Sequence, residues 1–129
     1  MNAVGPILVV DDDKALTLGL ALRLRSVGFE VRVCNDAGDA GAVAVREKPA
    51  AIILDIDMPR CTGLELHHCF QFAARLRDTP VIYLSGYRTE AHLQMAAEQG
   101  ASAFLTKPYI AEELVAALRS AIQQRMRQT

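Results

Sequence analysis

The fold is decided by the stretch Ala50–Pro59, which reads AAIILDIDMP. Its apolar residues 51–54 run without a polar break into Asp55, and Asp57 and the turn-forming Pro59 follow. A short apolar run bounded by turn signals indicates a strand that is buried on both faces of a sheet. A strand that stops at Asp55 holds this carboxylate at the carboxyl edge of the sheet, where open α/β sheets bind ligands. We therefore predict that Asp55 is the reactive group.

Three other predicted strands also end at side chains that carry chemistry. These strands are expected over residues 7–10, 81–84 and 102–105. The first leads directly into Asp11 and Asp12, the second into Ser85, and the third into a loop that contains Lys107. Because parallel strands place their carboxyl ends at one edge of the sheet, these groups should form a ring with Asp55.

Helices are predicted between the strands. They are expected over residues 14–27, from a cap at Asn35 or Asp36 to Lys48, and over residues 64–76, 89–99 and 111–124 or beyond. The first has leucines at four-residue spacing, a capping carboxylate at Asp13 and a terminating Gly28. Strands that alternate with such helices require right-handed crossovers and a parallel sheet covered on both sides.

The strand order follows from one exception to the apolar pattern. The remaining strand, over residues 29–34, alternates apolar and polar side chains, so it should lie at a sheet edge. Among doubly wound α/β folds, the flavodoxin-like order 2-1-3-4-5 satisfies this condition. We predict a flavodoxin-like (βα)5 fold with a parallel five-stranded sheet, formed by a single domain over residues 1–129.

Composition excludes several classes of function. The 14 basic and 15 acidic residues nearly cancel, which argues against direct nucleic acid binding through a basic surface. The three cysteines lack CxxC spacing and indicate free thiols in a reducing compartment. No apolar run is long enough to span a membrane, and the N-terminus does not resemble a signal peptide. We expect a cytoplasmic protein that does not contact membranes.

The predicted ring suits a hard cation and a phosphoryl group. Carboxylates packed together repel one another unless a cation joins them, and oxygen ligands are those that Mg²⁺ (or Mn²⁺) prefers. We expect Asp12, Asp55 and the backbone carbonyl of Asp57 to hold the metal, with Asp11 assisting partly through water. The hydroxyl of Ser85 and the ammonium group of Lys107 lie opposite these ligands and suit phosphoryl oxygens. A carboxylate can itself accept a phosphoryl group, which makes Asp55 a candidate phosphorylation site.

The same segments resemble the receiver domains of two-component response regulators. The resemblance rests on ILVVDDD, ILDIDMPRCTGLEL, VIYLSG and GASAFLTKPY, which occur in order and cover nearly the whole chain. It implies that Asp55 takes a phosphoryl group from the phosphohistidine of a sensor histidine kinase, from a phosphotransfer protein or from a small phosphodonor. It also implies that Ser85 is the switch hydroxyl, Phe104 the switch aromatic residue and Lys107 the family's lysine, joined to Pro108 by a cis peptide.

The mechanism implied is a two-state switch. Phosphorylation of Asp55 would pull Ser85 inward, Phe104 would rotate from an exposed to a buried position, and the face around the last strand and the last two helices would change its affinity for partners. Asp57 and Tyr87, each two residues beyond a strand-end site residue, flank the path of the hydrolytic water in the family. We expect these two side chains to tune the lifetime of the acyl phosphate, and we expect no enzymatic activity on a separate substrate.

The implied partners include a downstream effector or a fused output domain. A homodimer through the face of the last strand and last two helices is a further possibility. However, Ala103 and Ala117 stand where the DNA-binding subclass with a winged-helix output carries an Asp and an Arg that support such a dimer, which disfavours that subclass. The side chains of His67, His68 and His92, and of Arg119, Arg125 and Arg127 near the C-terminal end, are expected to be solvated.

Three alternatives remain open at this point. An aspartyl-phosphate phosphatase of the haloacid dehalogenase type would carry Thr where Pro59 stands and would need room for a cap domain. A flavin-binding module would place a phosphate loop, rather than three aspartates, after the first strand. A degenerate receiver would serve only as an interaction module, but the set of site residues is intact.

Overall fold

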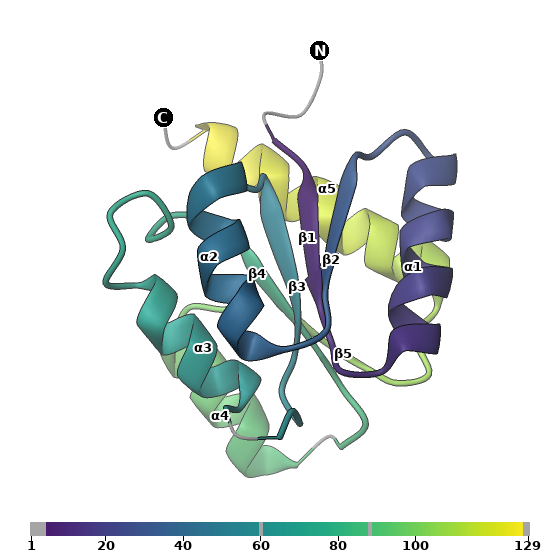
Figure 1. The fold of residues 1–129 in the computed structure, drawn as a ribbon. Coiled ribbons are helices and arrows are strands. Elements are labelled where there is room, and N and C mark those ends of the chain that lie inside the picture. The colour runs from purple at the N-terminus through teal and green to yellow at the C-terminus, as the bar shows by residue number, and fades with distance from the viewer. Residues whose placement is uncertain (1–4, 60, 88, 128–129) are drawn as a thin grey trace.

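A five-stranded parallel sheet lies between two layers of helices in the computed structural model, which describes residues 5–59, 61–87 and 89–127 (Figure 1). The elements are β1 (Ile7–Val10), α1 (Lys14–Ser26), β2 (Val31–Cys34), α2 (Ala37–Glu47), β3 (Ala51–Asp55), α3 (Gly63–Phe70), β4 (Val81–Ser85), α4 (Glu90–Glu98), β5 (Ala103–Thr106) and α5 (Ala111–Arg127). The strand order is β2-β1-β3-β4-β5, as the sequence predicts, and every pair of neighbours is parallel.

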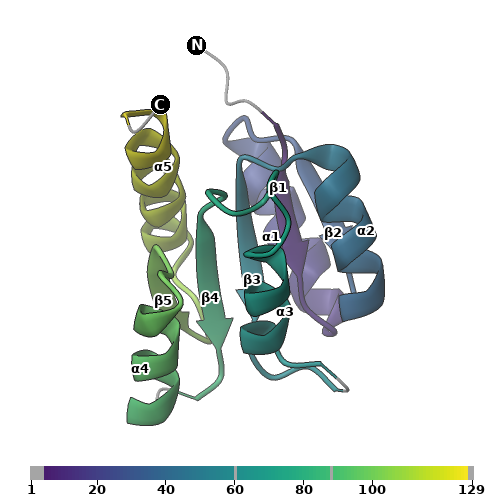
Figure 2. The ribbon, with the colours of Figure 1, turned by 90° about the vertical axis from the view of Figure 1, so that its left-hand side faces the viewer.

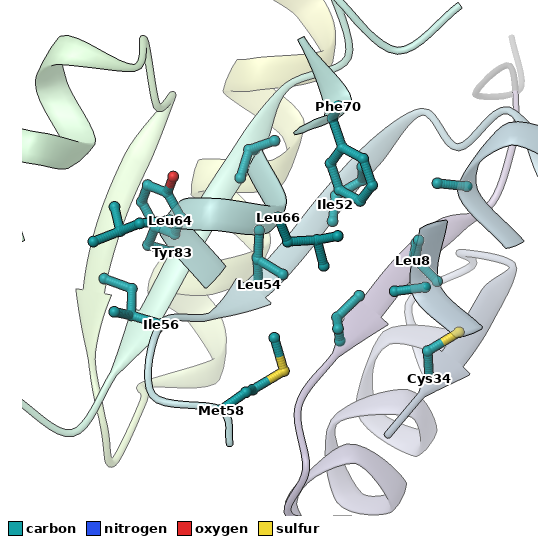
Figure 3. Close-up of a cluster of buried hydrophobic side chains, with 14 of the residues drawn as sticks. Leu8, Cys34, Ile52, Leu54, Ile56, Met58, Leu64, Leu66, Phe70 and Tyr83 are labelled. Atoms are coloured by element: carbon teal, nitrogen blue, oxygen red, sulfur yellow. The ribbon is translucent and has the colours of Figure 1, made fainter. Parts of the chain in front are cut away.

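Each face of the sheet has its own apolar core. Helices α1 and α5 cover one face and α2, α3 and α4 cover the other (Figure 2). Leu54 and Tyr83 belong to the second of these cores, together with Phe70 from α3 (Figure 3). The central strands β1, β3 and β4 are buried along their whole length, which explains why their sequences are apolar runs without alternation.

The register brings the ends of the strands together. Val10 lies beside Leu54, Asp55 beside Leu84, and Ser85 beside Thr106. The chain therefore leaves β1, β3, β4 and β5 at the same edge, which is the edge that holds the predicted ring of polar groups. Among the described helices, none has the length and apolar character needed to cross a membrane.

Two predicted helix starts are confirmed by their caps. The Asp13 side chain accepts a hydrogen bond from the backbone N–H of Leu16 at 3.0 Å and so caps α1. Of the two candidates for the cap of α2, it is Asp36 that accepts from the backbone N–H of Asp39, at 2.8 Å. The side chain of Asn35 lies elsewhere, at the functional edge.

Two predicted elements are shorter in the structure. Helix α3 ends at Phe70 rather than near residue 76, because the chain continues in turns with hydrogen bonds three residues apart, such as Leu76 N to Ala73 O. These turns expose Phe72 but still bury Leu76. Strand β2 pairs only from Val31 and its alternation is imperfect, yet it does lie at the sheet edge.

Candidate functional site

Three carboxylates and one ammonium group meet at the carboxyl edge of β1, β3 and β5. Asp11 and Asp55 are each only 2% exposed, whereas Asp12 is exposed. One carboxylate oxygen from each of the three lies within 4.8 Å of the others. The Nζ atom of Lys107 is 2.8 Å from Asp11 Oδ2 and 3.4 Å from Asp55 Oδ1. The structure thus brings together four of the residues that the sequence predicts at this site.

The cluster carries more negative charge than Lys107 neutralises. Burial, followed by the neighbouring charge of Asp11, raises the pKa of Asp55 to about 6, and the charge of Lys107 limits this rise. Burial also opposes the charged form of Lys107, but its hydrogen bond to Asp11 and the charges of both carboxylates hold the Lys107 pKa above its ordinary value. The ionised site therefore favours an additional cation.

The donor set fits a hard divalent ion. Carboxylate oxygens from Asp11, Asp12 and Asp55 are hard ligands, and the exposure of Asp12 leaves room for the waters that Mg²⁺ retains. The raised pKa of Asp55 also favours a bound cation, since a cation at these oxygens relieves the repulsion between Asp55 and Asp11. These residues could hold Mg²⁺ or Mn²⁺.

Backbone groups fix the orientation of the two buried carboxylates. The backbone N–H of Asp13 donates to Asp11 Oδ1 at 2.9 Å, and that of Asp57 donates to Asp55 Oδ1 at 3.2 Å. Asn35 donates from Nδ2 to the backbone carbonyl of Asp11 at 2.8 Å. These hydrogen bonds leave Asp55 Oδ2 available for a metal or for chemistry, whereas Asp11 Oδ2 contacts the Lys107 ammonium group.

Gly63 allows the loop after β3 to fold back against Asp55. A Cβ atom at Gly63 would stand 2.8 Å from the carbonyl carbon of Asp55 and would collide with its carbonyl oxygen. Without that side chain, the backbone N–H of Gly63 donates to the carbonyl of Ile56 at 2.9 Å. Thr62 then caps α3 with a capping box that includes Glu65. Apolar periodicity carries no information about this glycine, so the sequence does not reveal its close approach to Asp55.

Ser85 is fully buried and is bonded to Asp57 rather than to the cluster. Its Oγ atom donates to Asp57 Oδ2 at 2.9 Å and accepts from the backbone N–H of Tyr87 at 3.1 Å. The Asp57 side chain is exposed, and Tyr87 is 65% exposed. Sequence reasoning missed the Ser85–Asp57 bond because Ser85 ends β4 and Asp57 lies in the loop after β3, 28 residues away.

Phe104 on β5 is half-buried against the core under α2, α3 and α4. Its ring centroid is 6.3 Å from that of Tyr83, its register partner on β4, and the rings are tilted by 59°. The Phe104 ring therefore lies between the sheet and solvent. The expected cis peptide between Lys107 and Pro108 is also present.

The expectation for the histidines is wrong for His67. This side chain is 5% exposed, and its Nδ1 atom lies 2.6 Å from the hydroxyl of the fully buried Tyr83. Burial, followed by the charge of His68, lowers the pKa of His67 to about 4. An apolar pattern counts histidine as a polar residue, so it does not predict that His67 is buried against Tyr83. His68 is exposed, as expected, whereas His92 is half-buried.

Comparisons with known proteins agree with the geometry. The sequence profile of the response regulator receiver domain matches residues 7–119. The chain is 34% identical over 118 residues to response regulator MprA of Mycobacterium leprae, covering 92% of this chain and 51% of the relative. It thus spans about half the length of the MprA relatives that it matches.

Solved structures show the same fold. The chemotaxis protein CheY4 of Vibrio cholerae superposes with a TM-score of 0.87 at 28% identity, over 92% of this chain and 99% of that protein. A CheY-like receiver domain protein from Methanospirillum hungatei superposes with a TM-score of 0.90 at 24% identity, over 98% and 99% of the two chains. The predicted flavodoxin-like fold is therefore confirmed.

Proposed function

The chain belongs to the receiver domains of response regulators, the signalling modules of two-component systems, and on this premise we propose that Asp55 accepts a phosphoryl group. The observation that carries this proposal is the buried carboxylate of Asp55 at the end of β3, within 3.4 Å of the Lys107 ammonium group. The donor is the phosphohistidine of a sensor histidine kinase, a phosphotransfer protein or a small phosphodonor.

The reaction is a displacement at phosphorus. A carboxylate oxygen of Asp55 attacks, the bond between phosphorus and the donor nitrogen or oxygen breaks, and the leaving atom keeps its electron pair. Lys107 sits where its charge stabilises the phosphoryl oxygens, because its Nζ atom already reaches both buried carboxylates. Burial and the charge of Asp11 favour neutral Asp55, so the ionised nucleophile depends on the balancing cations.

We assign the metal site to Asp12, Asp55, the backbone carbonyl of Asp57 and, partly through water, Asp11. A bound Mg²⁺ or Mn²⁺ would supply Lewis-acid stabilisation of the phosphoryl oxygens. Asp12 is the exposed member of the cluster, so it offers the ion its first contact from solvent. Removal of the metal should therefore abolish phosphorylation even though Lys107 remains in place.

The Ser85–Asp57 hydrogen bond supplies the switch. In the unmodified protein the Ser85 hydroxyl donates to Asp57 Oδ2 at 2.9 Å. A phosphoryl dianion on Asp55 is a stronger acceptor for the Ser85 hydroxyl. When Ser85 donates to the phosphoryl group, it no longer donates to Asp57. Phe104 then occupies the space that Ser85 leaves, and the face formed by α4, β5 and α5 changes its affinity for an effector, a fused output domain or a second copy of the chain.

The kinase docks on α1 and the loop before α5. Leu18 and Leu22 lie one helical turn apart on α1 and are 61% and 59% exposed, and Ile110 is 56% exposed. Exposed apolar side chains of this size mark interaction surfaces when they recur on one side of a helix. Helix α1 starts directly after Asp13, so a partner on it is beside the acidic cluster.

We propose no enzymatic role on separate substrates, and the cytoplasmic location stays a prediction.

The experiment is incubation with Mg²⁺ and acetyl phosphate or phosphoramidate, followed by intact mass measurement. We expect a gain of one phosphoryl group that requires Mg²⁺ and disappears in Asp55→Asn. Asp13→Asn is the matched control and should retain the gain, because the Asp13 side chain only caps α1, and the variant keeps the backbone N–H that donates to Asp11. No gain with either donor, together with no binding of beryllium fluoride, would refute the proposal.

A further inference from the structure

A cationic hollow lies at the opposite end of the sheet from Asp55. The loops before β3 and β4 and the last turns of α5 surround a cavity of about 390 Å³. Figure 2 shows that α5 finishes at the end of the molecule opposite the loops that follow β3 and β4. Its lining combines three cations with apolar side chains. The cations are Lys48, Arg75 and Arg125, and the apolar residues include Pro49, Ile122 and Met126. The cavity is within the size range of small-ligand sites.

The charge of this cavity is not balanced by its own lining. Among the described residues that line it there is no carboxylate, and none of its three cations forms a salt bridge with another described residue. The neighbouring Glu47 is already engaged, since it accepts from Arg32 Nε at 2.9 Å. Cations gathered in a hollow raise the local concentration of anions.

Arg125 is held in place at the centre of this arrangement, contrary to the expectation of a solvated helix end. Its Nη1 atom lies 3.5 Å from the carbonyl of Pro49 and 3.4 Å from Thr79 Oγ1. It also lines an adjoining hollow of about 350 Å³ that is rich in hydrogen-bonding groups. Those groups include Gln71, Arg77, Thr79, Ser102 and Gln124, and Asp78 is the one carboxylate among the described residues that line this hollow.

We propose that the two hollows together bind a small nucleotide. Its phosphate groups lie against Arg75 and Arg125, because a guanidinium group pairs with phosphate oxygens through two parallel hydrogen bonds. Its base lies against Ile122 and Met126, which a bare anion would leave unused. An extended nucleic acid is disfavoured, because the cations line a hollow and the whole chain carries a net charge of −1.

The test is fluorescence anisotropy of N-methylanthraniloyl-ADP in Mg²⁺-free buffer, with competition by unlabelled ligands. We expect the wild-type chain to bind the probe, and unlabelled ADP to compete at least tenfold better than adenosine or inorganic phosphate. Arg75→Gln and Arg125→Gln should each weaken binding roughly tenfold, the loss expected for one charge-assisted hydrogen-bonding group. Arg23→Gln is the matched control and should bind as the wild type does, because Arg23 lies on α1 and faces Glu112.

Amide shifts in NMR spectra locate the ligand independently of the phosphorylation site. We expect ADP to move the signals of Thr79 and Ser102 and not those of Gly86 and Thr106. The proposal is overturned if ADP does not bind at millimolar concentration, or if inorganic phosphate competes equally well. It is also overturned if the two arginine variants bind as the wild type does while circular dichroism shows them folded, or if an anionic vesicle or acidic peptide binds there more tightly than ADP.

Discussion

Replacing Asp55 by Asn should stabilise the metal-free protein, and the gain should depend on pH. The pKa of Asp55 rises from an ordinary value of 3.8 to about 6 because the group is buried beside Asp11. A tenfold change in proton affinity is worth about 1.4 kcal/mol. Ionising Asp55 therefore costs the folded state about 3 kcal/mol at pH 8, and Asn does not incur this cost. We expect Lys107 to keep its partner in the variant, because its Nζ atom is 2.8 Å from Asp11 Oδ2 in the wild type.

The sign of the pH dependence follows from proton binding. Between pH 4 and pH 6 the folded wild-type protein holds a proton on Asp55 that the unfolded chain has released, so stability contributed by this group is present below pH 4 and is lost as the pH rises to about 6. We expect Asp55→Asn and wild type to differ little at pH 4. Above pH 7 the variant should be more stable by up to about 3 kcal/mol, or roughly 10 °C in melting temperature.

The assay is thermal unfolding of both proteins in EDTA across pH 4–8, repeated with Mg²⁺. The metal should narrow the gap at pH 8, because it binds folded wild-type protein and neutralises the repulsion that the variant lacks. Asp78→Asn, which changes an exposed loop carboxylate, is the control and should show no such trend. A gap that stays constant with pH, or a variant that is less stable than wild type at pH 8, would refute the reasoning.

Three further predictions concern the loops around the site. Asp57→Ala frees the Ser85 hydroxyl from a bond of 2.9 Å, so we expect beryllium fluoride to bind roughly tenfold more tightly in a titration, and equal affinity would contradict the switch. Tyr87→Ala should shorten the lifetime of the acyl phosphate in a decay assay, because it removes an exposed ring beside the water path; an unchanged decay rate would exclude this role. Gly63→Ala should lower the free energy of unfolding by about 1–3 kcal/mol and slow phosphorylation, because its Cβ meets the Asp55 backbone; Gly41→Ala, with open space around it, should do neither.

The acidic cluster could be predicted from sequence because it depends on local patterns and one topological rule. Each buried strand is predicted by an apolar run, and the alternation of apolar and polar residues near β2 predicts a sheet edge. Once the strand order is known, Asp11, Asp55 and Lys107 must lie at the same edge, and the structure places them within hydrogen-bonding or ion-pair distance. The prediction therefore needed no knowledge of individual side-chain conformations.

Contacts between distant side chains could not be predicted in this way. The hydrogen bond from Ser85 to Asp57 and the buried contact between His67 and Tyr83 each join polar residues from different elements, and no periodicity relates them. Arg125 is a similar case, because its contacts with Pro49 and Thr79 depend on how α5 ends against two loops. Sequence patterns therefore wrongly assign the side chains of His67 and Arg125 to solvent.

The measurement that tests the central claim most directly is the location of the phosphoryl group. The protein is phosphorylated with phosphoramidate and Mg²⁺, reduced with borohydride to convert an aspartyl phosphate to homoserine, and digested for peptide mass spectrometry. We predict homoserine at position 55 and unmodified aspartate at positions 11, 12 and 57. Homoserine at one of those other positions, or a phosphoryl group on a histidine with Asp55 unchanged, would contradict the account.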